Sequence, residues 1–331
     1  MARALVTGAT GLVGSYIVER LVRDEWTVRA LVRSPASWLE SLGVECVRGD
    51  VLDAQTFARA STGCDVIFHT AAAVTTGGGW EAFRRLNVDG TLNAISAAES
   101  SGAKLVHLSS VAVYGPEGRY RLSEKTDEDA SLGPLPEHMF YARSKRDSEA
   151  LVMEAHASGR IWATAVRPDV IYGRRDRQFV PRIARVLTFG IAPSIGGGTA
   201  TLAMVHAANV ADGAVRAAFV ERAGGRAYNL ANDFDVTARD FFLLAGEGLG
   251  KRVRLFSISK PVAQRTIGAA IGAVKMLSMG KMSVLSKDSL DFLTRDNPFT
   301  SERARRELGW SPAMRPEEGV PDAFRWWRQH H

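Results

Sequence analysis

A glycine-rich segment close to the N-terminus restricts the possible folds more than any other feature of the sequence. The apolar run Ala4–Thr7 leads directly into Thr7-Gly8-Ala9-Thr10-Gly11-Leu12-Val13-Gly14. Between a strand and a helix, Gly8 permits a tight turn, Gly11 lets backbone approach a pyrophosphate, and Gly14 allows the helix to lie close to the sheet. The N–H groups and the positive dipole end of that helix attract the anion. The segment therefore predicts a dinucleotide site formed by Gly8, Thr10, Gly11, Leu12 and Val13.

Short β-branched runs alternate with helical patterns through the first half of the chain. We predict strands at Ala4–Thr7, Thr27–Val32, Val44–Val47, Val66–His69, Leu105–Leu108 and Trp162–Arg167, and a seventh at Ala227–Leu230. Between them, segments such as Tyr16–Arg23 and Leu92–Ser100 carry apolar residues at three- and four-residue spacing, which is typical of helices packed on a sheet. This alternation predicts an α/β fold with a Rossmann-type, doubly wound parallel sheet.

The rhythm changes to loops and helices beyond Tyr172, which predicts a smaller, mostly C-terminal substrate-binding region. We assign residues 1–172 to a dinucleotide-binding Rossmann domain, with 208–235 returning to it. Residues 173–207 and 236–331 are assigned to the substrate-binding region. An apolar helical pattern covers Val262 to Leu285, and three interpretations remain open for it: a lid over a lipophilic substrate, a core or dimer-interface helix, and a contact with a membrane surface.

Composition argues against several classes of protein. The net charge of +6 comes from 42 basic and 36 acidic residues that are interspersed, so we expect no nucleic-acid partner. Cys46 and Cys64 suit neither a disulfide framework nor a zinc site, so we expect no metal and a reducing, cytoplasmic location. We also expect no targeting peptide. The uncharged stretch Val186–Ala211 is interrupted by glycines and a proline, which favours loops between short elements over a membrane span.

The end of the second predicted strand bears on the choice of cofactor. NAD-binding proteins usually present a carboxylate there to the ribose 2′-hydroxyl, whereas this chain has Arg33. A guanidinium can pair with a 2′-phosphate, so the sequence favours NADP, with NAD as the alternative if Arg33 is only a surface residue.

Small and acidic residues follow the third and fourth predicted strands. Asp50, next to Val51, stands where an adenine amino group would lie, although it could instead cap the region Leu52–Ala60. After the fourth strand, three small residues leave room for a cofactor or for close packing of helix on sheet: Ala71, Ala72 and Ala73.

A tyrosine and a lysine in the segment Tyr141-Ala142-Arg143-Ser144-Lys145 are the candidate catalytic pair. Their four-residue separation places Tyr141 and Lys145 on one face of a helix. An ammonium beside a phenol stabilises the phenolate and lowers its pKa, which suits proton exchange with a substrate oxygen. His69 and His107, which lie inside predicted strands, are interpreted as ordinary sheet residues.

These residues together resemble the extended short-chain dehydrogenase/reductase family over nearly the whole chain. Further matching segments are Asn87-Val88-Asp89-Gly90-Thr91, Arg167-Pro168, Tyr228-Asn229-Leu230 and Ala304-Arg305-Arg306-Glu307-Leu308-Gly309-Trp310-Ser311-Pro312. The resemblance implies Tyr141 as the acid/base, Lys145 as its pKa partner and a contact to the nicotinamide ribose, and Ser110 as the hydroxyl that orients the substrate oxygen. Ser109 is the alternative to Ser110. The resemblance also places Pro168 and Val170 beside the cofactor, and Asn87 as a residue that holds the central strands or a relay water.

Within that family, the sequence is most similar to the 3β-hydroxysteroid and sterol dehydrogenase branch and to flavonoid-type reductases. The similarity lies in Asn209 and in the segments Gly173–Pro181 and Asp296–Thr300. Nucleotide-sugar epimerases usually carry a diphosphate-binding arginine where this chain has Leu202, and an apolar side chain cannot pair with a diphosphate.

The resemblance implies an NAD(P)-dependent oxidoreductase that interconverts a ketone or aldehyde and an alcohol on a lipophilic, steroid-like or aryl substrate. The alternatives are a nucleotide-sugar epimerase or dehydratase with bound NAD and, more remotely, a catalytically silent dinucleotide sensor. The expected partner is a small-molecule substrate, and the sequence leaves open whether the chain forms a homodimer.

Overall fold

The computed structural model describes residues 2–75, 77–116, 124–231, 233–263 and 287–331. The chain forms two compact units. Unit 1 consists of Met1–Ile171, Val205–Asp233 and Phe299–Ala313, and unit 2 consists of Tyr172–Met204, Phe234–Pro298 and Met314–His331. Within the described residues, every helix is too short or too polar to cross a lipid bilayer.

Unit 1 is built on a seven-stranded sheet in which every neighbouring pair is parallel. The strand order is β10-β6-β5-β4-β1-β2-β3. Chain order therefore runs outward in both directions from β1 and β4, and in such sheets ligands bind beyond the carboxyl ends of the strands at this reversal. The strands are β1 (Arg3–Thr7), β2 (Thr27–Val32), β3 (Glu45–Arg48), β4 (Val66–His69), β5 (Lys104–Leu108), β6 (Ala163–Pro168) and β10 (Ala227–Leu230).

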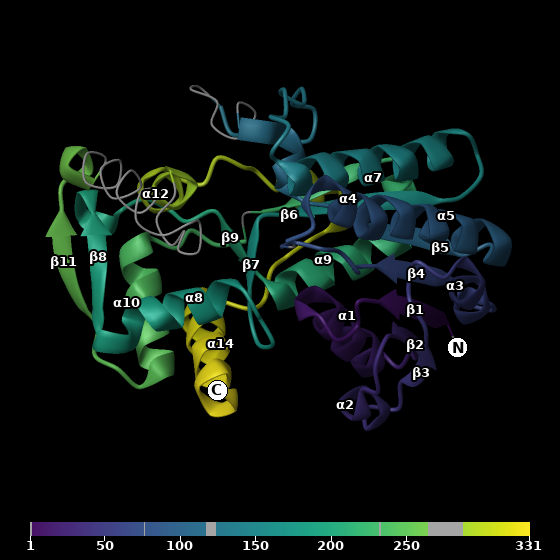
Figure 1. Cartoon of the computed structure of the whole chain (residues 1–331), viewed down its shortest axis with the longest axis horizontal. Coiled ribbons are helices and arrows are strands. Elements are labelled where there is room, and N and C mark those ends of the chain that lie inside the picture. Colours follow the sequence, from purple (N-terminus) through teal and green to yellow (C-terminus); the bar gives the residue numbers. More distant parts are fainter. Residues whose placement is uncertain (1, 76, 117–123, 232, 264–286) are drawn as a thin grey trace. The chain divides into compact units, whose positions relative to one another are not determined.

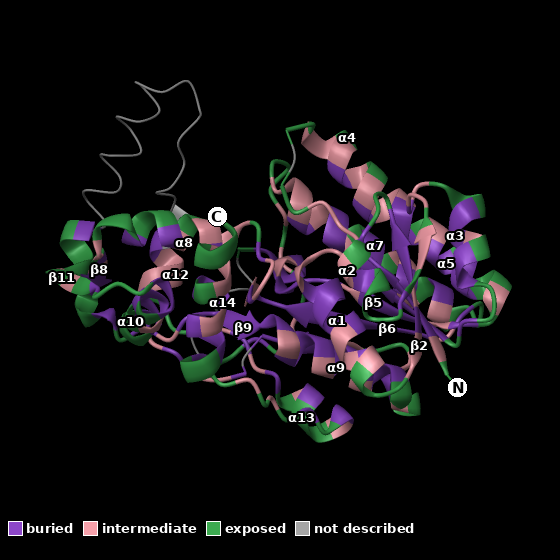
Figure 2. Cartoon of the chain, turned by 90° about the horizontal axis from the view of Figure 1, so that it is seen from below, coloured by how far each residue is buried: buried purple, intermediate pink, exposed green. Residues whose placement is uncertain are grey.

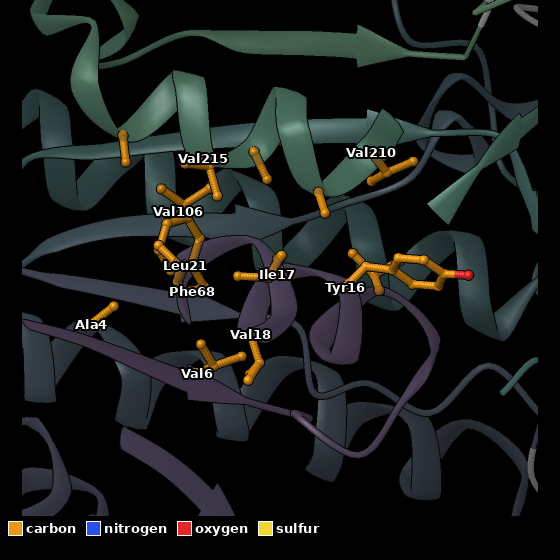
Figure 3. Packing of buried hydrophobic residues seen from close by; sticks show 14 of the residues in the cluster. Ala4, Val6, Tyr16, Ile17, Val18, Leu21, Phe68, Val106, Val210 and Val215 are labelled. Atoms are coloured by element: carbon orange, nitrogen blue, oxygen red, sulfur yellow. The ribbon is translucent and has the colours of Figure 1, made fainter. Parts of the chain in front are cut away.

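Helices cover both faces of this sheet (Figure 1). One face carries α1 (Leu12–Arg23) and α9 (Ala207–Phe219), and the other carries α3 (Ala54–Ser61), α5 (Gly90–Ser101) and α7 (Phe140–Ala157). A separate hydrophobic cluster fills the space on each side. Figure 3 shows the first of these clusters, in which apolar residues of α1 and α9 pack against the sheet: Ile17, Leu21, Val210, Val215, Phe68 and Val106.

The remaining elements are short in unit 1 and mostly helical in unit 2. Unit 1 also contains α2 (Ser37–Glu40), α4 (Gly79–Phe83), the π-helix η1 (Arg84–Asp89), η2 (Val111–Tyr114), η5 (Glu221–Ala223) and α13 (Glu302–Leu308). Unit 2 contains α8 (Phe179–Val186), η3 (Leu187–Phe189), β8 (Ile191–Ile195), η4 (Gly196–Gly198), α10 (Ala238–Leu249), β11 (Arg254–Ile258), α12 (Lys287–Thr294) and α14 (Pro316–His330). The chain passes between the units within β7 (Val170–Tyr172) and β9 (Met204–His206).

The predicted Rossmann-type α/β fold is confirmed, and all seven predicted strands lie within one residue of the observed bounds. The uncharged stretch 186–211 forms short strands and 3-10 turns followed by the start of α9. Of the apolar pattern predicted from Val262 to Leu285, residues 264–285 lie outside the described part of the chain.

The unit boundaries differ from the predicted ones by one to three residues at 172, 205–207 and 234–235, and one long segment lies in a different unit from the one that the sequence suggested. Residues 299–313 were assigned to the substrate-binding region, whereas they pack in unit 1. Trp310, which is 2% exposed, donates its indole N–H to the carbonyl oxygen of Asn209 on α9 at 2.9 Å. On the same segment, Glu307 accepts hydrogen bonds from Arg226 and Tyr228 beside β10. Because these partners lie far away in the sequence, local pattern did not predict the packing.

Candidate active site

The glycine motif forms a turn that suits a pyrophosphate. Gly8 has φ of +66°, a conformation that favours glycine, and its carbonyl oxygen accepts the Gly11 amide at 2.8 Å. A Cβ on Gly14 would lie 2.2 Å from that carbonyl oxygen, so only glycine allows α1 to start this close to β1. No side chain caps α1 at Gly11. Uncapped amides at a helix N-terminus, with backbone accessible beside them, fit the phosphates of a dinucleotide.

The residues predicted to bind the rest of the cofactor follow the neighbouring strands. Arg33 is exposed directly after β2. The Asp50 carboxylate accepts the amide of Leu52, the first residue of the region that it was expected to cap, at 3.0 Å, whereas the N-cap of helix α3 itself is Asp53. Val51 is buried in the cluster beneath α3 and α5.

The loop after β4 is held in place by hydrogen bonds between its backbone and the side chains of Thr7 and Asn87. The Ala71 amide donates to Thr7 Oγ1 at 3.3 Å. Asn87 accepts the Ala73 amide at 2.7 Å and donates to the Ala73 carbonyl oxygen at 3.0 Å. Asn87 is thus a structural clamp on this loop, while Ala72 lies between the two anchored alanines. Pro168 closes β6, and Val170 opens β7.

Tyr141, Ser110 and Lys145 come together at the carboxyl end of β5. Tyr141 stands in the first turn of α7, and its hydroxyl hydrogen-bonds with that of Ser110. Lys145, one turn further and 3% exposed, donates from Nζ to the carbonyl oxygen of Leu108 at 2.5 Å. The Ser109 hydroxyl is buried and has no hydrogen-bond partner among the described residues. Of the two serines, Ser110 is therefore the one that reaches the tyrosine.

The pKa of Tyr141 departs from its ordinary value in the opposite direction to the one the sequence suggested. Burial raises the pKa of the Tyr141 phenol, and the hydrogen bond with Ser110 only partly opposes this effect. Burial also lowers the pKa of Lys145 to about 8. The expected lowering of the phenol pKa by the ammonium is wrong for this structure, because the ammonium is bonded to the Leu108 carbonyl and desolvation of the phenol is the largest effect.

Glu149, one helical turn after Lys145 on α7, forms a buried ion pair with Arg167 of β6. The sequence did not predict this pair. The Arg167 guanidinium donates to both carboxylate oxygens of Glu149, with N–O distances of 2.5 to 3.2 Å. Arg167 also donates to the Tyr114 hydroxyl at 2.8 Å, and that hydroxyl donates to Asn229 at 2.8 Å. The negative charge of Glu149 raises the pKa of Lys145 and so opposes the effect of burial. The four-residue spacing indicates that Glu149 shares a helix face with Lys145, but it gives no sign of the pairing with Arg167.

Two histidines in adjacent strands are neutral residues of the sheet. His69 lies 2.9 Å from Thr7 Oγ1 through Nδ1, and His107 lies 3.2 Å from Ser148 Oγ through Nε2. Their rings stack at 5.8 Å between centroids. Burial lowers the pKa of His69 to about 3 and holds that of His107 well below its usual value. Neither histidine is therefore in its charged imidazolium form near neutral pH.

Leu202 and Asn209, which indicated the 3β-hydroxysteroid and sterol dehydrogenase branch in the sequence, are both buried. The Leu202 side chain is fully buried in unit 2. In unit 1, the Asn209 amide donates to the Asp233 carboxylate at 2.8 Å, and that carboxylate also accepts the His206 amide. Asn209 thus anchors the start of α9.

The chain is similar to oxidoreductases over nearly its whole length. Residues 5–232 match the model of the 3-beta hydroxysteroid dehydrogenase/isomerase family. A 4-hydroxy-2-methyl-3-oxo-4-farnesyl-3,4-dihydroquinoline-1-oxide ketoreductase of Stigmatella aurantiaca is 31% identical, over 98% of this chain and 96% of that protein. A 2-alkyl-3-oxoalkanoate reductase of Shewanella oneidensis is 28% identical, over 97% of this chain and 85% of that protein.

Solved structures share the fold. The UDP-glucuronic acid 4-epimerase of Bacillus cereus, solved in complex with NAD, superposes with a TM-score of 0.73 at 19% identity, covering 99% of both chains. The strand order, the glycine turn and the family match agree with one another, and they define an NAD(P)-dependent dehydrogenase or reductase of the extended short-chain type. The chain belongs to the 3-beta hydroxysteroid dehydrogenase/isomerase family.

Proposed function

We propose that this protein reduces the carbonyl group of a lipophilic ketone, with Tyr141 as the proton donor. The observation that carries the proposal is the meeting of Tyr141, Ser110 and Lys145 at the carboxyl end of β5. A nicotinamide dinucleotide held by unit 1 would supply the hydride for this reaction. The residues of the chain hold the substrate oxygen and provide its proton.

The electrostatics of the site favour a neutral phenol and a charged ammonium. Because burial raises the pKa of Tyr141, its hydroxyl is protonated near pH 7 and can donate to an oxygen that gains negative charge. Ser110 hydrogen-bonds with the Tyr141 hydroxyl, and its own hydroxyl would orient the carbonyl oxygen of the substrate. Lys145, with a pKa of about 8, is mostly protonated at pH 7, and its ammonium is held by the Leu108 carbonyl oxygen one helical turn from Tyr141.

Residues of unit 1 fit a dinucleotide, and NADP is the form that we propose. The turn at Gly8 and Gly11 and the uncapped start of α1 would hold the pyrophosphate. The exposed Arg33 after β2 would pair with a 2′-phosphate. Asp50, Ala71 to Ala73, Pro168 and Val170 line the ends of the neighbouring strands, where the adenine and nicotinamide halves would lie.

The names of the relatives support a ketone with a long apolar group as the substrate. One relative is named for a farnesyl-substituted oxo compound, and the other is named for 2-alkyl-3-oxoalkanoates. The buried Leu202 speaks against the alternative of a nucleotide-sugar epimerase, because it offers no charge to a diphosphate.

The test is a screen for NADPH and NADH consumption with 2-alkyl-3-oxoalkanoates, 3-ketosteroids, aryl ketones and short aliphatic ketones. We expect turnover with the long apolar ketones. Tyr141→Phe should lower kcat by about a hundred- to ten-thousand-fold while cofactor affinity is retained, since the phenol acts on the substrate oxygen.

Ser110→Ala and Ser109→Ala form a matched pair of serine variants for the same screen. Ser110→Ala should lower kcat strongly, whereas Ser109→Ala should not, because the Ser109 hydroxyl has no hydrogen-bond partner among the described residues. Near-normal turnover by Tyr141→Phe, or equal losses in the two serine variants, would contradict the assigned roles. Epimerisation of a nucleotide sugar without net cofactor consumption would favour the alternative function.

A further inference from the structure

Unit 2 carries a small parallel sheet of β8 and β11 with large apolar side chains exposed at one end. Phe189 is 86% exposed, Ile191 48% and Phe256 47%. The two strands lie side by side (Figure 1), and Figure 2 shows β11 as largely exposed whereas the strands of the central sheet are mostly buried. Parallel sheets are as a rule covered on both faces, and clustered exposed apolar groups mark interaction sites.

The strand register shows that the apolar residues share one face of this sheet. Ile191 pairs with Arg254, and Phe256 follows Arg254 by two residues, so all three side chains project to the same side. Further along this face, Ile195 and Ile258 pack in a cluster with Leu290 and Leu293 of α12. Apart from Arg254, the side chains named on this face are apolar, and among the described residues α12 covers its carboxyl end.

Positive charge surrounds the exposed end. Lys251, Arg252 and Arg254 are all exposed, and Lys251 donates from Nζ to the Thr188 carbonyl oxygen at 2.6 Å, which places its ammonium beside the residue preceding Phe189. The two segments that form this end, residues 177–204 and 248–263, contain several Arg and Lys residues but no Asp or Glu.

We propose that this docking surface, formed by Phe189, Ile191, Lys251, Arg252, Arg254 and Phe256, binds an anionic phospholipid bilayer. Protruding apolar side chains insert at the boundary of headgroups and acyl chains without needing a complementary pocket, and the cations attract anionic lipids.

The charge of the two segments argues against a second copy of the chain as the occupant of this surface. In a two-fold contact, the same patch meets itself, so its cations would face one another without any carboxylate from these segments to offset them. The proposal does not depend on the proposed function, because all of its residues lie in unit 2 and none contributes to the proposed catalytic site.

The test is co-sedimentation of the full-length protein with vesicles of phosphatidylcholine alone and of phosphatidylcholine mixed with phosphatidylserine. We expect salt-sensitive binding to the mixed vesicles and little binding to phosphatidylcholine. Each basic residue near an anionic surface contributes about fivefold to the affinity, so the charge reversals Lys251→Glu and Arg254→Glu together should weaken binding at least about 25-fold. The double variant Phe189→Ser/Phe256→Ser should also lose binding.

Phe219→Ser is the matched control, because Phe219 is 54% exposed at the end of α9 in unit 1. It should bind vesicles like the unaltered protein. Absence of vesicle binding at low salt, or unchanged binding by the Phe189→Ser/Phe256→Ser variant, would overturn the proposal. A lower melting temperature of Phe189→Ser without vesicles would also overturn it, because it would show that Phe189 is packed within the protein. Loss of a dimer by the same variant in sedimentation equilibrium would overturn it as well, because the surface would then bind a second copy.

Discussion

The buried pair of Arg167 and Glu149 offers a sharp test of how this fold supports its active-site helix. Both side chains are 8% exposed, and Arg167 is bonded to Glu149 and to the Tyr114 hydroxyl. Arg167→Met removes the guanidinium but leaves the Glu149 carboxylate buried without its counter-charge. Breaking a buried pair in this way costs about 3–5 kcal/mol.

The expected loss can be read as a change in melting temperature. At about 2–4 °C per kcal/mol for a unit of this size, Arg167→Met should lower the melting temperature by roughly 6–20 °C, measured by calorimetry or circular dichroism. The double variant Glu149→Leu/Arg167→Met removes both charges and should recover most of the loss, since replacing a buried pair by apolar residues is often close to neutral.

An exposed ion pair of similar geometry serves as the control. Arg160 lies 2.5 Å from Glu99, but their side chains are 47% and 43% exposed. Arg160→Met should leave the melting temperature nearly unchanged, because water and ions screen such pairs. The predicted role of burial is refuted if Arg167→Met lowers the melting temperature no more than Arg160→Met does. It is also refuted if the double variant Glu149→Leu/Arg167→Met melts at a lower temperature than Arg167→Met.

Three further predictions concern the cofactor turn, cofactor choice and pH. Gly14→Ala should lower both NADPH affinity and melting temperature, with an overpacking cost of about 1–3 kcal/mol. Gly77→Ala should change neither, since nothing lies within 4 Å of the added Cβ. Equal NADPH dissociation constants for the two variants would contradict the close approach at Gly14. Arg33→Asp should weaken NADPH binding about ten- to hundredfold and spare NADH, and an unchanged ratio of the two Kd values would show that Arg33 does not read the 2′-phosphate. Lys145 has a pKa of about 8 in the folded protein against an ordinary value of 10.5, so the unfolded chain binds more protons between these values and stability should rise with pH across that window. This gain should be absent from Lys145→Met, and parallel pH profiles of melting temperature would rule it out.

The sequence by itself determined the fold and the residues that gather at its centre. Strand positions were predicted within one residue because an apolar run of β-branched residues is a local property that a buried parallel strand requires. The glycine turn was predictable for the same reason, since Gly8 adopts positive φ and Gly14 touches Gly8 itself. Helical periodicity likewise placed Tyr141 and Lys145 on one face of α7.

The tertiary structure decided what surrounds those residues. The pairing of Glu149 with Arg167 joins α7 to β6, and the Lys145 ammonium reaches the Leu108 carbonyl at the end of β5. Neither contact follows from local spacing. Burial sets the direction of the pKa values of Lys145 and Tyr141, and Glu149 and Ser110 respectively oppose it. The sequence specifies which ionisable groups are present, but their protonation depends on desolvation and on partners far away in the chain, which exist only once the chain has folded.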